Sequence, residues 1–98
     1  MKNFYKNFFE EINNLLNQSD ISSLDKIAKT LSSLKRKNKV IIFGNGGSAA
    51  ISSHVSVDLT KNAKVRSINF NEADLLTCFA NDYGYEKVFS KSLEFYAD

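Results

Sequence analysis

The stretch Lys39-Val-Ile-Ile-Phe-Gly-Asn-Gly-Gly-Ser-Ala-Ala50 decides how the chain folds. Its apolar run Val40–Phe43 is β-branched at three of four positions, which is typical of a buried strand in a parallel sheet. Gly44–Gly47 ends that strand, and Ser48 offers a hydroxyl as the N-cap of a following helix. This arrangement predicts an anion site above the strand, because free N–H groups and the helix dipole favour negative charge there.

Composition limits the class of protein. The chain has 98 residues, 43% hydrophobic and 24% charged, which is enough for one domain at most. A net charge of +2 is too small to indicate a nucleic-acid partner. The single Cys78 excludes an internal disulfide and fits a reducing compartment. No apolar stretch approaches the roughly 20 residues that span a bilayer, so we expect a cytoplasmic protein without a membrane partner.

Two amphipathic helices are predicted before the strand. The first covers residues 3–17, and the second begins at Asp20 or Ser22 and continues to about Lys37. We expect them to form an N-terminal helical hairpin. The basic run Lys35–Lys39 is interpreted as the last turn of the second helix, where it complements the dipole, rather than as a phosphate-binding patch.

The remaining chain alternates helices with one more strand. The pattern predicts a helix over 48–60, a weak strand over 65–70 and a short helix over 72–80. A turn at Asn81–Gly84 leads into a final helix over 85–96. Two strands cannot bury both faces of a parallel sheet, so the chain is expected to be a fragment or a protomer that needs further strands.

Several side chains are expected to face inward. In the helix after the glycine turn they are Ile51, Val55 and Leu59. In the short helix they are Leu75, Leu76 and Phe79, with Cys78 inert on the same apolar face. The aromatic residues expected in the core rather than on a stacking surface are Tyr83, Tyr85, Phe89, Phe95 and Tyr96.

The glycine turn alone allows a dinucleotide site. Gly44-x-Gly46-x-x-Ala49 satisfies the loose fingerprint between a strand and a helix. The acidic residue that such a site needs about 20 positions later is absent, and Glu72 lies beyond the second strand. A connecting turn without a ligand is the plainer alternative, and we expect no nucleotide cofactor.

Two pairs of polar residues are candidates for chemistry. His54 and Asp58 lie four apart, so a helix places them on one face as a metal pair, an acid–base pair or an ordinary surface pair. Two ligands leave a zinc site incomplete. Asn81 and Asp82 follow a predicted helix, where the alternative to a functional role is a cap or an Asx-turn.

Three segments together resemble the sugar isomerase (SIS) family, and within it the phosphoheptose isomerases. They are Gly44-Asn-Gly-Gly-Ser-Ala49, His54-x-x-x-Asp58-Leu59 and Leu75-Leu-Thr-Cys-Phe-Ala-Asn-Asp-Tyr-Gly-Tyr-Glu-Lys-Val-Phe89. The resemblance implies a three-layer α/β/α sandwich with a parallel, Rossmann-like sheet. Residues 1–98 would be one partial SIS domain, with N-terminal helices over 1–38 and the first half of the α/β core over 39–98.

The resemblance also implies an activity and a set of site residues. The reaction would be isomerisation of sedoheptulose 7-phosphate to glycero-manno-heptose 7-phosphate for heptose and surface polysaccharide synthesis, in a homotetramer. The residues implied to contact the sugar phosphate are Asn45, Gly46, Gly47, Ser48, Asn81 and Asp82. His54 would be a zinc ligand, and Asp58 would be both the catalytic base and a zinc ligand.

Two departures from the family pattern matter. Asp58 is one methylene shorter than the Glu that many relatives have. The Ser/Thr-rich phosphate loop and the C-terminal Gln and His of the family have no counterpart in this sequence. We therefore expect the chain by itself to be inactive. The alternative is a non-catalytic SIS module that binds a sugar phosphate or a protein partner.

Overall fold

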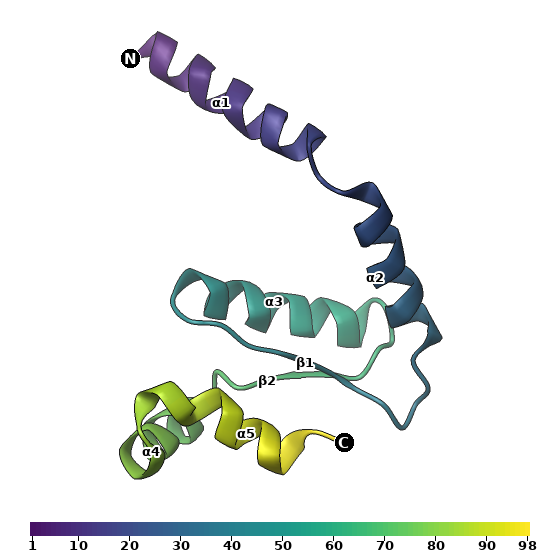
Figure 1. The fold of residues 1–98 in the computed structure, drawn as a ribbon, viewed down its shortest axis with the longest axis vertical. Coiled ribbons are helices and arrows are strands. Elements are labelled where there is room, and N and C mark those ends of the chain that lie inside the picture. The colour runs from purple at the N-terminus through teal and green to yellow at the C-terminus, as the bar shows by residue number, and fades with distance from the viewer. The chain divides into compact units, whose positions relative to one another are not determined.

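A computed structural model describes residues 1–98 as two compact units, residues 1–32 and residues 33–98 (Figure 1). The first unit contains α1 (Lys2–Asn17) and nearly all of α2 (Ile21–Ser33). The second contains two strands and the remaining helices. No helix of the chain combines the length and the apolar character needed to cross a membrane.

The second helix begins where the sequence predicts. The Ser23 N–H donates to Asp20 Oδ1 at 3.1 Å, and the Ser23 hydroxyl donates to Oδ2 at 2.6 Å. These hydrogen bonds favour the charged carboxylate, so the pKa of Asp20 lies below its usual value. Asp20 therefore caps α2 in its ionised form.

The two N-terminal helices are confirmed, but α1 and α2 do not contact each other, so the expected hairpin packing is wrong for this chain. Each helix keeps its apolar stripe exposed instead of burying it against the other. The exposed apolar residues of α1 are Phe4, Tyr5, Phe8, Phe9, Ile12, Leu15 and Leu16. This face is available for another surface to cover.

The basic run does not end α2. The helix stops at Ser33, and the run that follows lies in the connection to the first strand. The guanidinium Nη1 of Arg66 donates to the carbonyls of Arg36 and Lys37, both at 3.1 Å. The helix does not continue because residues 35–38 include no apolar side chain that would extend its apolar stripe. The carbonyls of Arg36 and Lys37 are hydrogen-bonded by Arg66 instead of by helical N–H groups.

The predicted strand–helix–strand unit is confirmed. β1 (Val40–Ile42) and β2 (Ser67–Asn69) pair in parallel, with Ile41 opposite Ile68, and α3 (Gly47–Lys61) connects them. Both strands are shorter than the sequence pattern suggests. A two-stranded sheet offers each strand one neighbour only, so its ends are not held in the ladder.

The face of α3 that packs on the sheet differs from the prediction. Ser52 and Ser56 are buried, whereas Ile51 is 66% exposed and Val55 is 38% exposed. Serine side chains are small enough to let the helix approach the strands closely, and the Ser52 hydroxyl donates to the Ala49 carbonyl at 2.9 Å. The β-branched residues of α3 therefore point away from the tightest part of the interface.

Asn71, expected only as a turn residue, joins β2 to α3. Its Nδ2 group contacts the Ala49 carbonyl and the Ser52 hydroxyl, both at 2.8 Å, and the Ser53 hydroxyl at 3.0 Å. The side chain is partly buried, so these contacts are shielded from water. Asn71 thus fixes the start of α3 against the end of β2.

On the opposite side of the sheet lies α5 (Val88–Tyr96), which follows α4 (Ala73–Tyr83) and a 3-10 turn η1 (Tyr85–Lys87). Figure 1 shows α3 and α5 on opposite sides of the strands, which confirms the predicted α/β/α layering. The Phe43 ring lies between Phe89, at 4.7 Å between ring centroids, and Phe70, at 5.8 Å. These rings join the strands to α5.

The core is small. Phe70 and Val88 are its only buried apolar residues. The prediction of a wider aromatic core is therefore wrong, because all its members except Phe89 are exposed, namely Tyr83, Tyr85, Phe95 and Tyr96. A chain with two strands has too little sheet surface to cover them.

Candidate functional site

The glycine turn after β1 holds three glycines with three different environments. A Cβ on Gly44 would lie 2.6 Å from the Ser48 Cβ, so only glycine lets the strand end approach the helix this closely. Gly46 has φ 57° and ψ −122°, a positive-φ conformation that glycine adopts without strain. Gly47 has open space around it and begins α3.

The N-cap of α3 is Gly46, so the prediction that Ser48 caps this helix is wrong. Ser48 lies within the first turn, and its N–H donates to the Asn45 carbonyl at 3.0 Å. The N–H groups of Ala49 and Ala50 donate to the Gly46 carbonyl. The N–H groups of Gly46 and Gly47 make no hydrogen bond within the chain, as a site for an oxygen-rich ligand requires.

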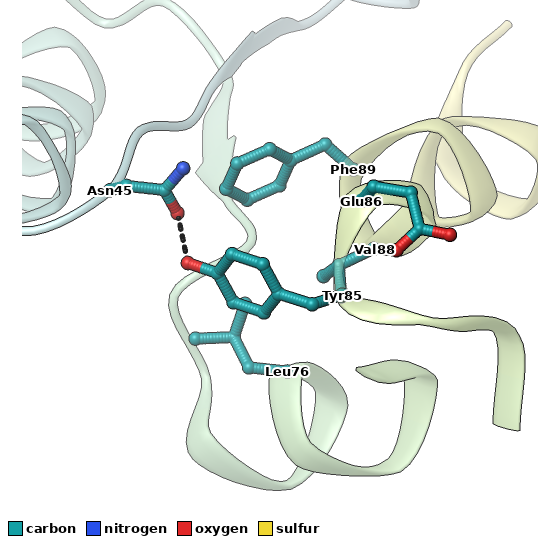
Figure 2. Close-up of a pocket in the computed structure, with 6 residues that line it drawn as sticks. All are labelled: Asn45, Leu76, Tyr85, Glu86, Val88 and Phe89. Carbon is teal, nitrogen blue, oxygen red and sulfur yellow. Dashed lines mark hydrogen bonds between the residues drawn. The ribbon is translucent and has the colours of Figure 1, made fainter. Parts of the chain in front are cut away.

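A cavity of about 110 Å³ lies beside this turn. Its lining consists of Asn45, Leu76, Tyr85, Glu86, Val88 and Phe89 (Figure 2). The Tyr85 hydroxyl donates to Asn45 Oδ1 at 2.9 Å and so joins the glycine turn to η1. Sequence reasoning assigned Tyr85 to the core and missed its place at this cavity; its position directly after Gly84, at the end of a helix, was the available signal.

The second wall of the cavity is not the one expected. Asn81 and Asp82 do not line it, because α4 continues through both residues and ends only at Gly84, which has φ 93°. The predicted turn at residues 81–84 is therefore wrong. The wall comes instead from η1 and the start of α5, through Tyr85 and Glu86 together with their neighbours.

Asp82 has a different set of partners. Its Oδ1 accepts from Asn81 Nδ2 at 3.0 Å, and its Oδ2 accepts from the Cys78 thiol at 3.5 Å. The hydrogen bond and the negative charge of Asp82 raise the pKa of Cys78 above its ordinary value. Cys78 is exposed rather than packed on an apolar face, and its protonated state still makes it a poor nucleophile at neutral pH.

The structure places His54 and Asp58 together on α3. His54 Nε2 lies 3.4 Å from Asp58 Oδ2, and both side chains are exposed, by 80% and 51%. Asn62 Nδ2 donates to the other oxygen, Asp58 Oδ1, at 3.2 Å. No third His, Cys, Asp or Glu joins them closely enough to hold a metal ion. The pair can supply two ligands, or a base and its partner, to a site that other groups complete.

Comparison with known proteins identifies relatives of this chain. No family model matches it. A phosphoheptose isomerase from Akkermansia muciniphila is 43% identical over 67 residues, covering 62% of this chain and 35% of that protein. One from Fusobacterium nucleatum is 32% identical over 99 residues, covering 94% of this chain and 51% of that protein.

A solved structure agrees with these sequences. The phosphoheptose isomerase of Neisseria gonorrhoeae superposes with a TM-score of 0.82 at 26% identity, covering 98% of this chain and 54% of that one. The chain is a relative of the phosphoheptose isomerases. The resemblance to this type of SIS protein and the α/β/α fold expected from it are thereby confirmed. The chain spans between about a third and about half of the length of the relatives it matches.

Proposed function

We propose that this chain contributes part of the active site of a phosphosugar isomerase that interconverts sedoheptulose 7-phosphate and glycero-manno-heptose 7-phosphate. The observation that carries the proposal is the similarity, in sequence and in fold, to proteins named phosphoheptose isomerase. The glycine turn and the adjacent cavity support it, because they combine free N–H donors with a polar rim.

The chemistry fits the residues that are present. In the ketose-to-aldose direction, a base removes a proton from C1 while the carbonyl oxygen O2 gains a proton, so that an enediol forms. A proton then returns to C2, while the O1 proton leaves so that the new carbonyl forms at C1. We assign Asp58 as the base. Asn45, Gly46, Gly47 and Ser48 would hold the sugar end of the substrate.

Further residues take supporting roles in this proposal. Asn81 and Asp82 would bind substrate hydroxyls, from a position outside the cavity beside the glycine turn. His54 and Asp58 fit a zinc ion as two of its ligands, since an imidazole nitrogen and a carboxylate oxygen are both donors that zinc accepts. Zinc, when bound, polarises a carbonyl as a Lewis acid. Its remaining ligands would come from outside these 98 residues.

We propose that the protein works as a homo-oligomer, as a tetramer. The proposal is supported by the exposed apolar residues of α1 and by Ile51 and Val55 of α3. Burying these side chains in a subunit interface would be favourable, because it removes apolar surface from water. The cytoplasmic location and the absence of a nucleotide cofactor and of a nucleic-acid partner remain predictions.

A titration and a turnover assay test the proposed function. We expect the purified chain to bind sedoheptulose 7-phosphate saturably and to ignore a nicotinamide dinucleotide. We expect isomerisation only when the chain is supplied with the segment that relatives carry beyond it, and we expect Asp58→Asn to abolish that turnover. Binding of the dinucleotide without binding of the sugar phosphate would contradict the proposal.

A non-catalytic sugar-phosphate module is the second candidate. It is favoured by the absence of a third metal-binding side chain near His54 and Asp58. This candidate predicts that the supplemented protein binds the sugar phosphate without turnover, and that Asp58→Ala leaves its affinity unchanged. Turnover that depends on Asp58 would exclude it.

A further inference from the structure

One hydrogen bond connects the glycine turn to the opposite wall of the cavity. The Tyr85 hydroxyl donates to Asn45 Oδ1 at 2.9 Å, across 40 residues of sequence. Asn45 belongs to the connection between β1 and α3, and Tyr85 opens η1. Figure 2 shows the amide oxygen of Asn45 directed at the tyrosine, with the amide nitrogen on the other side of the group.

We infer that Tyr85 is a positioning residue, which orients the Asn45 amide so that its Nδ2 group is presented as a donor to a ligand oxygen. This inference rests on the proposed function, in which Asn45 contacts the substrate. A primary amide has one accepting and one donating end. Because Tyr85 occupies the accepting end, the donating end is left for a sugar hydroxyl or a phosphate oxygen.

Tyr85 is 65% exposed, and its ring lies beside the apolar part of the cavity lining. Gly84 precedes it with φ 93°, and a Cβ at that glycine would lie 2.8 Å from Glu86 Oε1, so the backbone there suits glycine. Beside the ring, Leu76, Val88 and Phe89 line the same cavity. Replacing Tyr85 by phenylalanine removes the hydroxyl that makes the hydrogen bond and leaves the other atoms of the side chain unchanged.

The orientation has a consequence for ligand choice. With Oδ1 held by Tyr85, the Asn45 Nδ2 group and the unpaired N–H groups of Gly46 and Gly47 are free donors on this rim, while the Glu86 carboxylate lines another part of the cavity. A ligand rich in acceptor oxygens is matched to these donors. Asn45→Asp would still accept the Tyr85 hydrogen bond, but it would replace the donor by a second, negatively charged acceptor that repels a phosphate or hydroxyl oxygen.

The test is carried out on the 98-residue chain labelled with ¹⁵N. The side-chain amide signal of Asn45 is identified as the one lost in Asn45→Asp, and its heteronuclear NOE reports how rigidly the amide is held on the ps–ns timescale. Tyr85→Phe is compared with Tyr83→Phe, which makes the same chemical change at a tyrosine whose hydroxyl has no hydrogen-bond partner in the chain. Affinity for sedoheptulose 7-phosphate is measured by calorimetry on the same samples.

We expect Tyr85→Phe to lower the NOE of the Asn45 amide and to weaken sugar-phosphate binding about fivefold, the factor typical of one lost hydrogen bond. Tyr83→Phe should change neither quantity. An unchanged NOE and unchanged affinity in Tyr85→Phe would overturn the inference while leaving the proposed function intact. A lowered NOE in a chain whose unmodified form binds no sugar phosphate would uphold the orientation and reject the proposed function.

Discussion

Replacing Gly44 by alanine should destabilise the chain, whereas the same change at Gly47 should not. A Cβ at position 44 would lie 2.6 Å from the Ser48 Cβ and 2.8 Å from the Ser48 carbonyl carbon. Carbon atoms in good contact are about 3.5–4.0 Å apart, so roughly 1 Å of overlap must be relieved. The obstacle includes the backbone of α3, which cannot rotate away as a side chain can.

The magnitude follows from comparable overpacking. Extra carbon atoms in a close-packed site cost about 1–3 kcal/mol, so we expect a loss of about 2 kcal/mol for Gly44→Ala. With an m value of about 1–2 kcal/mol/M, the urea midpoint should fall by roughly 1–2 M. Gly46→Ala meets open space but must keep φ 57° with ψ −122°, a backbone region sparsely populated by other residues, which costs about 1–3 kcal/mol. Gly47→Ala meets open space within a helix and should be neutral or stabilise by up to about 1 kcal/mol.

Urea unfolding followed by circular dichroism ranks the three variants. The expected order of stability places Gly47→Ala at or above the unmodified chain, and Gly46→Ala and Gly44→Ala below it. A Gly44→Ala chain with an unchanged midpoint would refute the close approach of Gly44 to Ser48. Equal losses at Gly44 and Gly47 would show that any side chain in this turn is harmful, and would refute the distinction drawn between their environments.

Three further predictions concern other parts of the second unit. Asn71→Ala should lower the free energy of unfolding by about 1–3 kcal/mol, because it removes the contacts of Nδ2 with α3. The control Asn62→Ala, at an exposed site, should change this free energy by less than about 0.5 kcal/mol. Equal changes of the two variants in urea unfolding would contradict this prediction. The Glu72 carboxylate accepts a hydrogen bond from the Leu75 N–H at 2.8 Å, and its pKa lies below the usual 4.5. The stability that this carboxylate adds is therefore complete above pH 4.5 and is lost as the pH falls through the lower pKa of the folded state. In unfolding curves recorded at successive pH values, Glu72→Gln should lose this part of the acid sensitivity. Asp82→Asn should lower the raised pKa of Cys78 and speed its reaction with a thiol reagent at pH 8, and an unchanged rate would show that Asp82 does not hold the thiol protonated.

Much of the local structure could be read from the sequence. The apolar run at Val40–Phe43, the glycine turn and the periodic residues that follow predicted a strand, a turn and a helix, and all three are present. The Asp20 cap and the pairing of His54 with Asp58 were also predictable, because each involves residues three or four apart. The same holds for the family resemblance, whose motifs lie in short stretches of sequence.

Some errors are local, such as the Ser48 cap and the turn at residues 81–84, and others concern packing that sequence spacing does not describe. Periodicity placed Ile51 and Val55 against the sheet, but close packing favoured the small Ser52 and Ser56. The polar pair at residues 81–82 suggested a turn, but α4 continued until Gly84, where a positive φ ends it. The aromatic residues of α4 and α5 were expected in a core that two strands are too few to build.

The sequence alone thus determined the order of the elements, the parallel strand–helix–strand unit and the glycine turn at its centre, because backbone propensities and contacts within one helical turn decide these features. Only the tertiary structure decided what the turn faces. Asn45 meets Tyr85 across 40 residues, and Asn71 binds α3 from beyond β2. Such contacts depend on how separate elements pack, and they make the glycine turn one rim of a cavity.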